Sequence, residues 1–193
     1  MKKIFVSAVC FFSALLFFTA CSLESLLPPD DAQKTKFYDL SLPKPLEARD
    51  FQVVVRAFTG LARHKMVFRD VGNTVLYDEF NRWVSPPEQL LMRNVSVSFS
   101  NDAPQKENIP AYILSANVLD CSFDIANKQV ILLIRYIISN YEDSADMISG
   151  VKFYKQDVSE VSPDVFAETV SSCAEQFAKD IFNVISEKRR VLN

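Results

Sequence analysis

Glycine and histidine are scarce in this sequence of 193 residues, which contains three glycines and a single histidine. A phosphate-binding loop needs clustered glycines so that the backbone can approach the phosphates, whereas Gly60, Gly72 and Gly150 stand far apart. His64 has no second histidine with which to hold a metal and no partner set for nucleophilic catalysis. The sequence argues against a P-loop ATPase, a zinc enzyme and a triad hydrolase, so we expect neither catalytic residues nor a metal site.

Basic residues are not in surplus either. The chain has 21 lysines and arginines against 24 acidic residues, which gives a formal charge of −3. A protein that grips a nucleic acid backbone needs a cationic surface, so we expect no nucleic acid partner. Hydrophobic types make up 49% of the chain, which is enough for a packed core, and the length suits one domain.

The N-terminus has the pattern of an export signal. Lys2 and Lys3 precede a nearly unbroken apolar run over residues 4–18, which is shorter than the ~20 residues of a membrane-spanning helix. The following Phe18-Thr19-Ala20-Cys21 resembles the bacterial lipobox, although leucine is commoner than phenylalanine at its first position. We expect a lipoprotein signal peptide over residues 1–20, a covalent lipid on Cys21 and no other cofactor. The alternative is an ordinary signal peptide cut near Ala20.

Residues 21–35 have the composition of a lipidated, flexible tether, with two adjacent prolines followed by polar residues. The segment 22–35 could span at most ~45 Å when extended and ~20 Å as a coil. Acyl chains on Cys21 would contribute ~0.8 kcal/mol per buried methylene, which gives a stable membrane anchor. Ser22 replaces the aspartate that retains lipoproteins at the inner membrane of enteric bacteria, which favours the periplasmic face of the outer membrane. We predict one folded domain over residues 36–193.

Alternating apolar residues predict strands over residues 37–40, 51–58, 65–70, 74–80, 111–125, 129–140 and 148–157. Gly72 and Asn73 can adopt the positive φ of a tight turn, so the third and fourth strands should form a hairpin. The strand over residues 129–140 is apolar on both faces at its start. Such a strand is either covered on both sides or meets a partner chain, a second copy included, and we favour burial within the monomer.

Two helices are signalled by their starts. Ser85, Pro86 and Glu88 have the spacing of a capping box, with Ser85 as the cap, and Ser162 caps a second helix with Pro163 in its first position. Apolar residues recur along the second helix at helical spacing, at positions 166, 170, 173, 177, 181 and 184. The order of elements predicts an α+β fold, a mostly antiparallel sheet with two helices packed on it.

Besides the expected lipid-bearing Cys21, two cysteines remain after cleavage, Cys121 on a predicted strand and Cys173 on the predicted second helix. Exported proteins meet an oxidising environment, so the pair could form a disulfide. Two buried free thiols are the favoured alternative, because sequence positions do not establish the Cα separation that a bridge needs.

Two segments of the sequence resemble a known family. Residues 37–41, with the sequence Phe-Tyr-Asp-Leu-Ser, are similar to its Tyr-Tyr-Thr-Leu opening. Residues 68–87 are similar to its central motif, in which a hairpin strand ends in an Arg-Trp-Ala-Glu-Pro type segment that opens a helix. Arg82, Trp83 and Pro86 carry this resemblance, whereas Asp39, Val84 and Ser85 depart from the usual residues. The family is that of the ABC-type transport auxiliary lipoproteins, PqiC-like.

The resemblance implies a small domain similar to the N-terminal domain of TolB and a lipoprotein without catalytic residues. Its expected partners are an MCE-domain protein, which forms a lipid conduit between membranes, and the ABC-type transport components paired with it. Lipid itself is a further candidate partner. Arg82, Trp83 and Pro86 would serve either structure or partner contact. The alternative function is a structural or assembly lipoprotein of the envelope that acts by protein contact only.

Overall fold

The described chain alternates strands with two helices in an α+β arrangement, which confirms the predicted fold class. The structure is a computed structural model that describes residues 34–47, 50–72, 74–100, 109–143 and 145–192, and Thr35–Asn193 form one compact unit. Its strands are β1 (Lys36–Tyr38), β2 (Gln52–Thr59), β3 (Lys65–Arg69), β4 (Val75–Trp83), β5 (Ala111–Asp124), β6 (Gln129–Asn140) and β7 (Met147–Asp157). Its helices are α2 (Pro87–Ser98) and α3 (Pro163–Leu192).

All seven strands belong to one sheet, in the order β1-β4-β3-β5-β6-β7, with β2 also paired to β5. The β3–β4, β5–β6 and β6–β7 pairs are antiparallel, whereas the β1–β4, β2–β5 and β3–β5 pairs are parallel. The sheet is therefore mixed, and its two longest pairings, β5–β6 and β6–β7, are antiparallel, in keeping with the expected mostly antiparallel sheet. Parallel pairing needs a crossover connection, and the segment containing α2 supplies it between β2 or β3 and β5.

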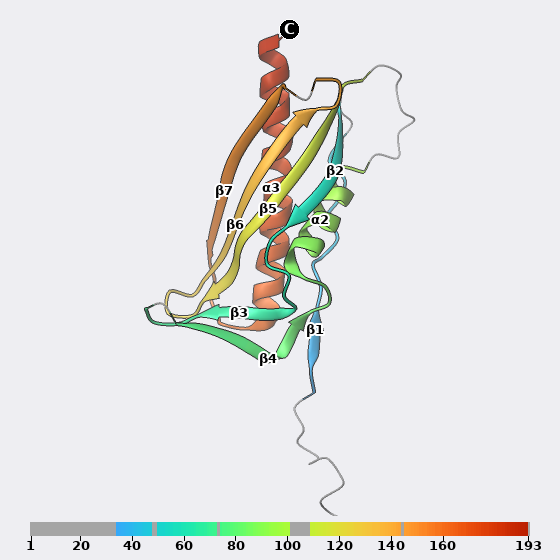
Figure 1. The fold of residues 1–193 in the computed structure, drawn as a ribbon. Helices are drawn as coiled ribbons and strands as arrows, with labels where there is room; N and C mark the ends of the chain where they lie inside the picture. Colours follow the sequence, from blue (N-terminus) through green and yellow to red (C-terminus); the bar gives the residue numbers. More distant parts are fainter. Residues whose placement is uncertain (1–33, 48–49, 73, 101–108, 144, 193) are drawn as a thin grey trace, which may run out of the picture. The chain divides into compact units, whose positions relative to one another are not determined.

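The long strand β5 organises this sheet. Its residues 111–117 pair with β2, and Phe123 and Asp124 at its end pair with β3, so that two short strands share one edge of a single long one. On its other edge β5 pairs with β6 along almost its whole length. The β3–β4 hairpin is thereby attached at the far end of β5 (Figure 1).

The helices cover one face of the sheet, where the core lies. Helix α3 runs behind β5, β6 and β7, and α2 packs against α3 and β2 (Figure 1). Ser162 Oγ accepts a hydrogen bond from the Val165 amide at 3.2 Å, as its predicted capping role requires. The inward rows of β6 and α3 are at most 6% exposed: Val130, Leu132, Ile134, Tyr136 and Ile138, and Phe166, Val170, Cys173, Phe177 and Ile181. Burial of each large apolar side chain stabilises the fold by ~1.5–3 kcal/mol.

The predicted β3–β4 hairpin is present. The Asp70 amide donates to the Thr74 carbonyl oxygen at 3.0 Å, and Gly72 has the positive φ of +73° that the turn requires. The predicted turn residue Asn73 lies outside the described residues. Strand β4 continues to Trp83, beyond the predicted end at residue 80, and so brings the family motif into the sheet.

Candidate functional site

Trp83 lies at the end of β4 and belongs to the core. It is 1% exposed, and its indole packs edge-on against the Phe166 ring of α3 with 5.2 Å between the ring centroids. Its backbone N–H donates to the His64 carbonyl oxygen at 2.7 Å. A side chain buried to this extent cannot reach a partner in this conformation, so Trp83 anchors β4 to the helix layer.

Helix α2 begins without the predicted capping box. The helix starts at Pro87, Pro86 occupies the N-cap position, and no side chain caps the helix. Pro87 disfavours helical geometry in the residue before it, and Pro86 accordingly has the extended angles φ −53° and ψ 143°. The cap predicted at Ser85 is therefore wrong, because the second proline moves the helix start by one residue.

Arg82 lies on the opposite side of β4 from Trp83, in register with Lys65 of β3 and Phe37 of β1. Its Nη2 donates to the Glu79 carbonyl oxygen at 3.4 Å, and its Nε is buried without a hydrogen-bond partner. Arg82 takes part in none of the ion pairs formed within the described part of the chain. It therefore leaves an uncompensated positive charge on this side of the sheet.

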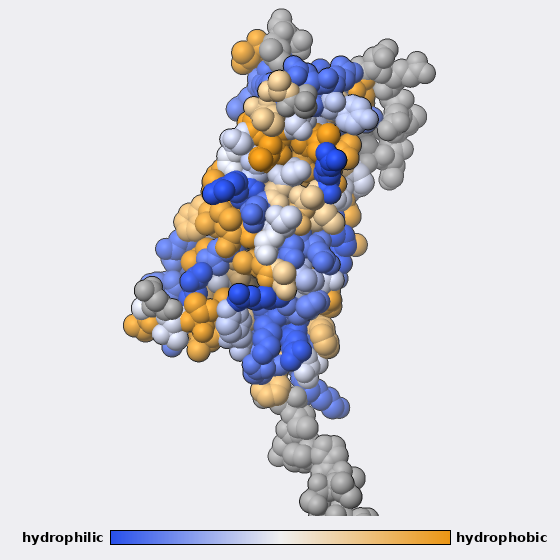
Figure 2. All heavy atoms as spheres, viewed as in Figure 1, coloured by the Kyte–Doolittle hydropathy of each residue, from blue (hydrophilic) through white to orange (hydrophobic). Residues whose placement is uncertain are grey.

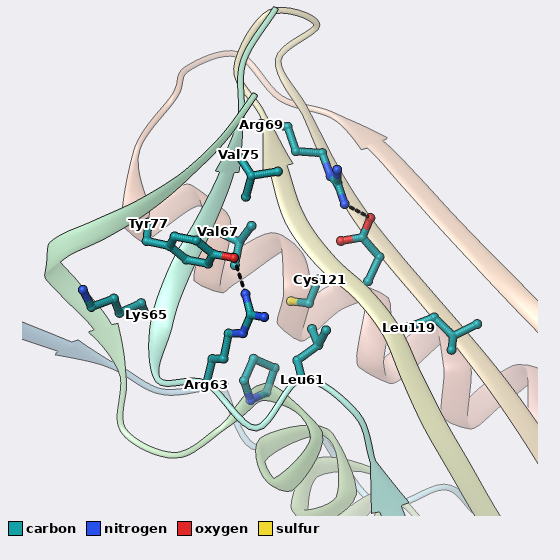
Figure 3. Close-up of a pocket in the computed structure, with 11 residues that line it drawn as sticks. Leu61, Arg63, Lys65, Val67, Arg69, Val75, Tyr77, Leu119 and Cys121 are labelled. Atoms are coloured by element: carbon teal, nitrogen blue, oxygen red, sulfur yellow. Dashed lines mark hydrogen bonds and ion pairs between the residues drawn. The ribbon is translucent and has the colours of Figure 1, made fainter. Parts of the chain in front are cut away.

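A cavity of about 170 Å³ lies between the β3–β4 hairpin and β5 (Figure 3). Apolar and basic residues share its lining: Leu61, Val67, Val75, Leu119 and Cys121 with Arg63, Lys65 and Arg69, beside Tyr77, Pro87 and Asp120. This combination can attract an anionic group and hold an apolar one beside it. The cavity contains no nucleophile with an activating base.

The basic residues of this region differ in how their charges are balanced. Arg69 Nη2 lies 2.8 Å from Asp120 Oδ2, and Lys65 Nζ lies 2.6 Å from Glu79 Oε1. Arg63 instead donates to the neutral Tyr77 hydroxyl, and its guanidinium carbon lies 5.2 Å from the centroid of that ring (Figure 3). The charge of Arg63, like that of Arg82, has no carboxylate partner among the described residues.

Sequence reasoning missed this basic cluster. The alternation of Lys65, Val67 and Arg69 along β3 was a visible signal that all three share one side of a strand. Their neighbours on β4 were not predictable, because Lys65 pairs with Arg82 whereas Val67 pairs with Tyr77. A bulge over the intervening residues of β4 sets this register, and strand periodicity alone does not reveal it.

Among the described residues no helix lies over the second face of β6 and β7, which corrects the expectation that β6 is buried on both sides within the monomer. Its apolar residues, which we call the open face, are Ile131, Leu133, Ile137, Val151 and Phe153. Ile137, Val151 and Phe153 are 45%, 54% and 59% exposed, whereas Ile131 and Leu133 are half-buried. Figure 2 shows hydrophobic residues on this side of the molecule, interspersed with hydrophilic ones. The two helices both lie on the other face, so only the inward row of β6 is covered.

Cys121 of β5 and Cys173 of α3 are both buried and carry free thiols. Burial raises the pKa of both thiols, that of Cys173 to about 11, so neither is a thiolate at neutral pH. A protonated, buried thiol is a poor nucleophile and a poor metal ligand. Neither cysteine therefore offers reactive chemistry in this conformation.

Cys21 and the expected signal peptide lie outside the described residues. Within the described ranges, no three His, Cys, Asp or Glu side chains are grouped so as to hold a metal ion. Within the same ranges, no helix has the length and apolar character needed to cross a membrane.

These features define a class of protein: an α+β domain with helices on one sheet face, an apolar and basic surface on the other, and only buried, protonated cysteines in the part described. Residues 44–182 match the family model described as the ABC-type transport auxiliary lipoprotein component, and the chain belongs to this family. The resemblance noted in the sequence is confirmed. Membership gives the protein an accessory role in transport and the cell-envelope location of a lipoprotein.

Two solved structures share the fold. Protein XCC0632 from Xanthomonas campestris, described under the family model DUF330, has a TM-score of 0.66 and 14% identity, covering 82% of this chain and 100% of that one. A crystal structure described as that of an uncharacterized protein has a TM-score of 0.62 and 13% identity, covering 79% and 99%. No curated protein matches the sequence. At these identities the likeness shows the fold alone, and the expected similarity to the N-terminal domain of TolB stays a prediction.

Proposed function

We propose that this protein is a lipid-anchored, non-catalytic accessory of an MCE and ABC-type system that moves lipid between membranes, and that it acts on the periplasmic face of the outer membrane. The open face is the observation that carries the proposal. Contiguous apolar residues on the surface of a folded domain mark a contact site. For an auxiliary component of transport, the fitting occupant of that site is another component of the same system.

The open face is built from side chains that the fold itself does not need. Leu133 pairs in register with Phe153, and Val151 lies two residues from Phe153 on β7, so these three side chains are neighbours. Arg135, Ser149 and Lys155 lie on the same side of the sheet around them. Their inward neighbours supply the contacts to α3. A partner that covers the open face would bury apolar area without disturbing the core.

The anchor is tested by replacing Cys21 with alanine. We expect the variant to leave the membrane fraction and to appear in the soluble fraction of the envelope, because it cannot receive the acyl chains. Fractionation followed by immunoblotting measures this. A variant that still pellets with membranes would contradict the anchoring.

The partner is tested by placing a photocrosslinking amino acid at position 153 in cells that carry the intact system. We expect crosslinks to the MCE-domain protein, because the Phe153 side chain is exposed on the open face. A matched crosslinker at position 179 on α3 is the control, since Lys179 is also exposed but belongs to the helix layer. Equal capture from both positions would contradict a specific contact through the open face.

The alternative is an assembly lipoprotein that acts by protein contact alone. Crosslinks from position 153 to an outer-membrane barrel protein, with none to an MCE-domain protein, would favour it. A gene neighbourhood that holds an MCE protein and an ABC permease would favour the transport role.

A further inference from the structure

The outer side of β1, β3 and β4 has a different chemistry from the open face. We define the hairpin face as Phe37, Arg63, Lys65, Tyr77, Phe80 and Arg82. Phe37, Tyr77 and Phe80 are 63%, 42% and 40% exposed, so three aromatic rings meet solvent beside three basic residues. We infer that the hairpin face lies on the anionic surface of the membrane that holds the lipid anchor, with its aromatic rings at the level of the lipid headgroups.

Register places these residues on one side of the sheet. Phe37 pairs with Arg82, and Lys65 pairs with the same arginine from the other side. Tyr77 pairs with Val67, which lies two residues from Lys65 on β3, so Tyr77 shares this side, and the exposed Phe80 lies in the bulge of β4 between Tyr77 and Arg82. Arg63, Lys65 and Tyr77 line one shallow depression together with His64 and Glu79. Aromatic and basic side chains therefore interleave on one continuous surface.

Charge favours an anionic occupant. Lys65 is paired with Glu79, whereas Arg63 and Arg82 form no ion pair within the ranges that the structure describes. The expected mature chain has 19 basic and 24 acidic residues, a formal charge of −5, so a surplus of positive charge here is a local feature. Basic residues near an anionic bilayer each contribute ~1 kcal/mol, and aromatic rings favour the headgroup region.

The segment that joins Cys21 to β1 also favours the membrane as the surface that the hairpin face contacts. This step rests on the proposed lipid anchor at Cys21. The described domain begins with β1 at Lys36, and β1 carries Phe37 of the hairpin face. Residues 22–35 would span ~20 Å as a coil, so this edge of the sheet is the part of the domain that stays near the bilayer. The acyl chains on Cys21 would hold the chain at the bilayer, and a basic, aromatic surface would orient the domain on it.

The test uses the lipidated mature protein in vesicles of phosphatidylethanolamine and phosphatidylglycerol that contain a lipid spin-labelled at the headgroup. An environment-sensitive dye is attached to Phe80→Cys and, as the matched control, to Lys179→Cys on α3. The native Cys121 and Cys173 are buried, so the folded protein is labelled at the introduced cysteine. We expect the dye at position 80 to be quenched severalfold more than the dye at position 179.

The basic residues are tested in the same vesicles with the pair Arg63→Glu and Arg82→Glu, and with Arg135→Glu on β6 as the control. We expect the pair to reduce the quenching at position 80, as high salt should, and the control to leave it unchanged. In cosedimentation of the Cys21→Ala chain with these vesicles, loss of each basic residue should weaken binding about fivefold.

Each other outcome overturns the inference. Equal quenching at positions 80 and 179 in protein that floats with the vesicles would show that the hairpin face does not meet the membrane. The dye at position 80 could instead report a more apolar environment as more protein is bound per vesicle, without being quenched by the labelled lipid. That result would show that the hairpin face binds a second copy of the chain. Failure of the lipidated protein to float would contradict the anchor itself, and flotation reveals this before any quenching is measured.

Discussion

Replacement of Trp83 by alanine tests whether the family motif acts through the core. Trp83 is 1% exposed and contacts Phe166, so its removal leaves a cavity between β4 and α3. Truncation of a buried tryptophan costs ~3–5 kcal/mol, and in a domain of this size 1 kcal/mol lowers the melting temperature by ~2–4 °C. We therefore expect the melting temperature to fall by roughly 6–20 °C.

Thermal unfolding followed by circular dichroism measures this change, with Val84→Ala as the matched control. Val84 is the next residue and is 42% exposed, so its truncation should leave melting nearly unchanged. A Trp83→Ala protein that melts like the control but no longer captures the transport partner would refute the reasoning. That result would make Trp83 a contact residue and would require a conformation in which the indole is exposed.

Three further predictions concern the backbone, the thiols and pH. Gly60→Ala should lower the melting temperature strongly, because Gly60 has φ +142° and a Cβ there would lie 2.2 Å from the Val118 carbonyl oxygen. Cys121 and Cys173 should resist a thiol reagent in the folded protein and react once denaturant is added, which absorbance titration would show. Asp180→Asn should lower the free energy of unfolding at neutral pH. The difference should shrink as acid takes the pH below the ordinary carboxyl pKa of 3.8, which chemical denaturation at several pH values would follow.

The sign of the Asp180 effect follows from its surroundings. Burial opposes its charge, but hydrogen bonds from Tyr154, Lys152 and Gln176 outweigh burial and lower its pKa. A group whose pKa is lowered by folding stabilises the protein above its unfolded pKa and loses this contribution as pH falls through the folded value. The difference in unfolding free energy between the unchanged protein and Asp180→Asn could instead stay constant down to the lowest pH measured. That result would contradict the stabilising role of these hydrogen bonds.

Local patterns predicted the elements well, and in β6 the match is complete. The alternation of residues 129–140 gave the bounds of the strand, and the apolar spacing of α3 gave its buried stripe from Phe166 to Ile181. These features depend on periodicity that is visible within a few turns of chain. The same argument found the β3–β4 hairpin from its turn residues.

Long-range pairing was beyond the reach of local patterns. Nothing in β2 or β3 indicates that both run parallel to β5, because strand direction depends on the crossover through α2. The apolar side chains on the outer face of β6 indicated that another part of the chain or a partner covers this face, but they did not indicate which. Sequence reasoning therefore identified the open face as an ambiguity, and only the placement of both helices on the opposite face resolved it.

The two faces of β6 and β7 allow contact and stability to be separated on neighbouring residues. Leu132 is fully buried against the helix layer, whereas Phe153, in register with the adjacent Leu133, is 59% exposed. Leu132→Ala should cost ~2–5 kcal/mol of stability, and Phe153→Ala should stay within ~1 kcal/mol of the unchanged protein. Phe153→Ala should nevertheless reduce capture of the transport partner from intact envelopes. If it retains full capture, the open face is not the contact surface, and if it melts as early as Leu132→Ala, the face is not open.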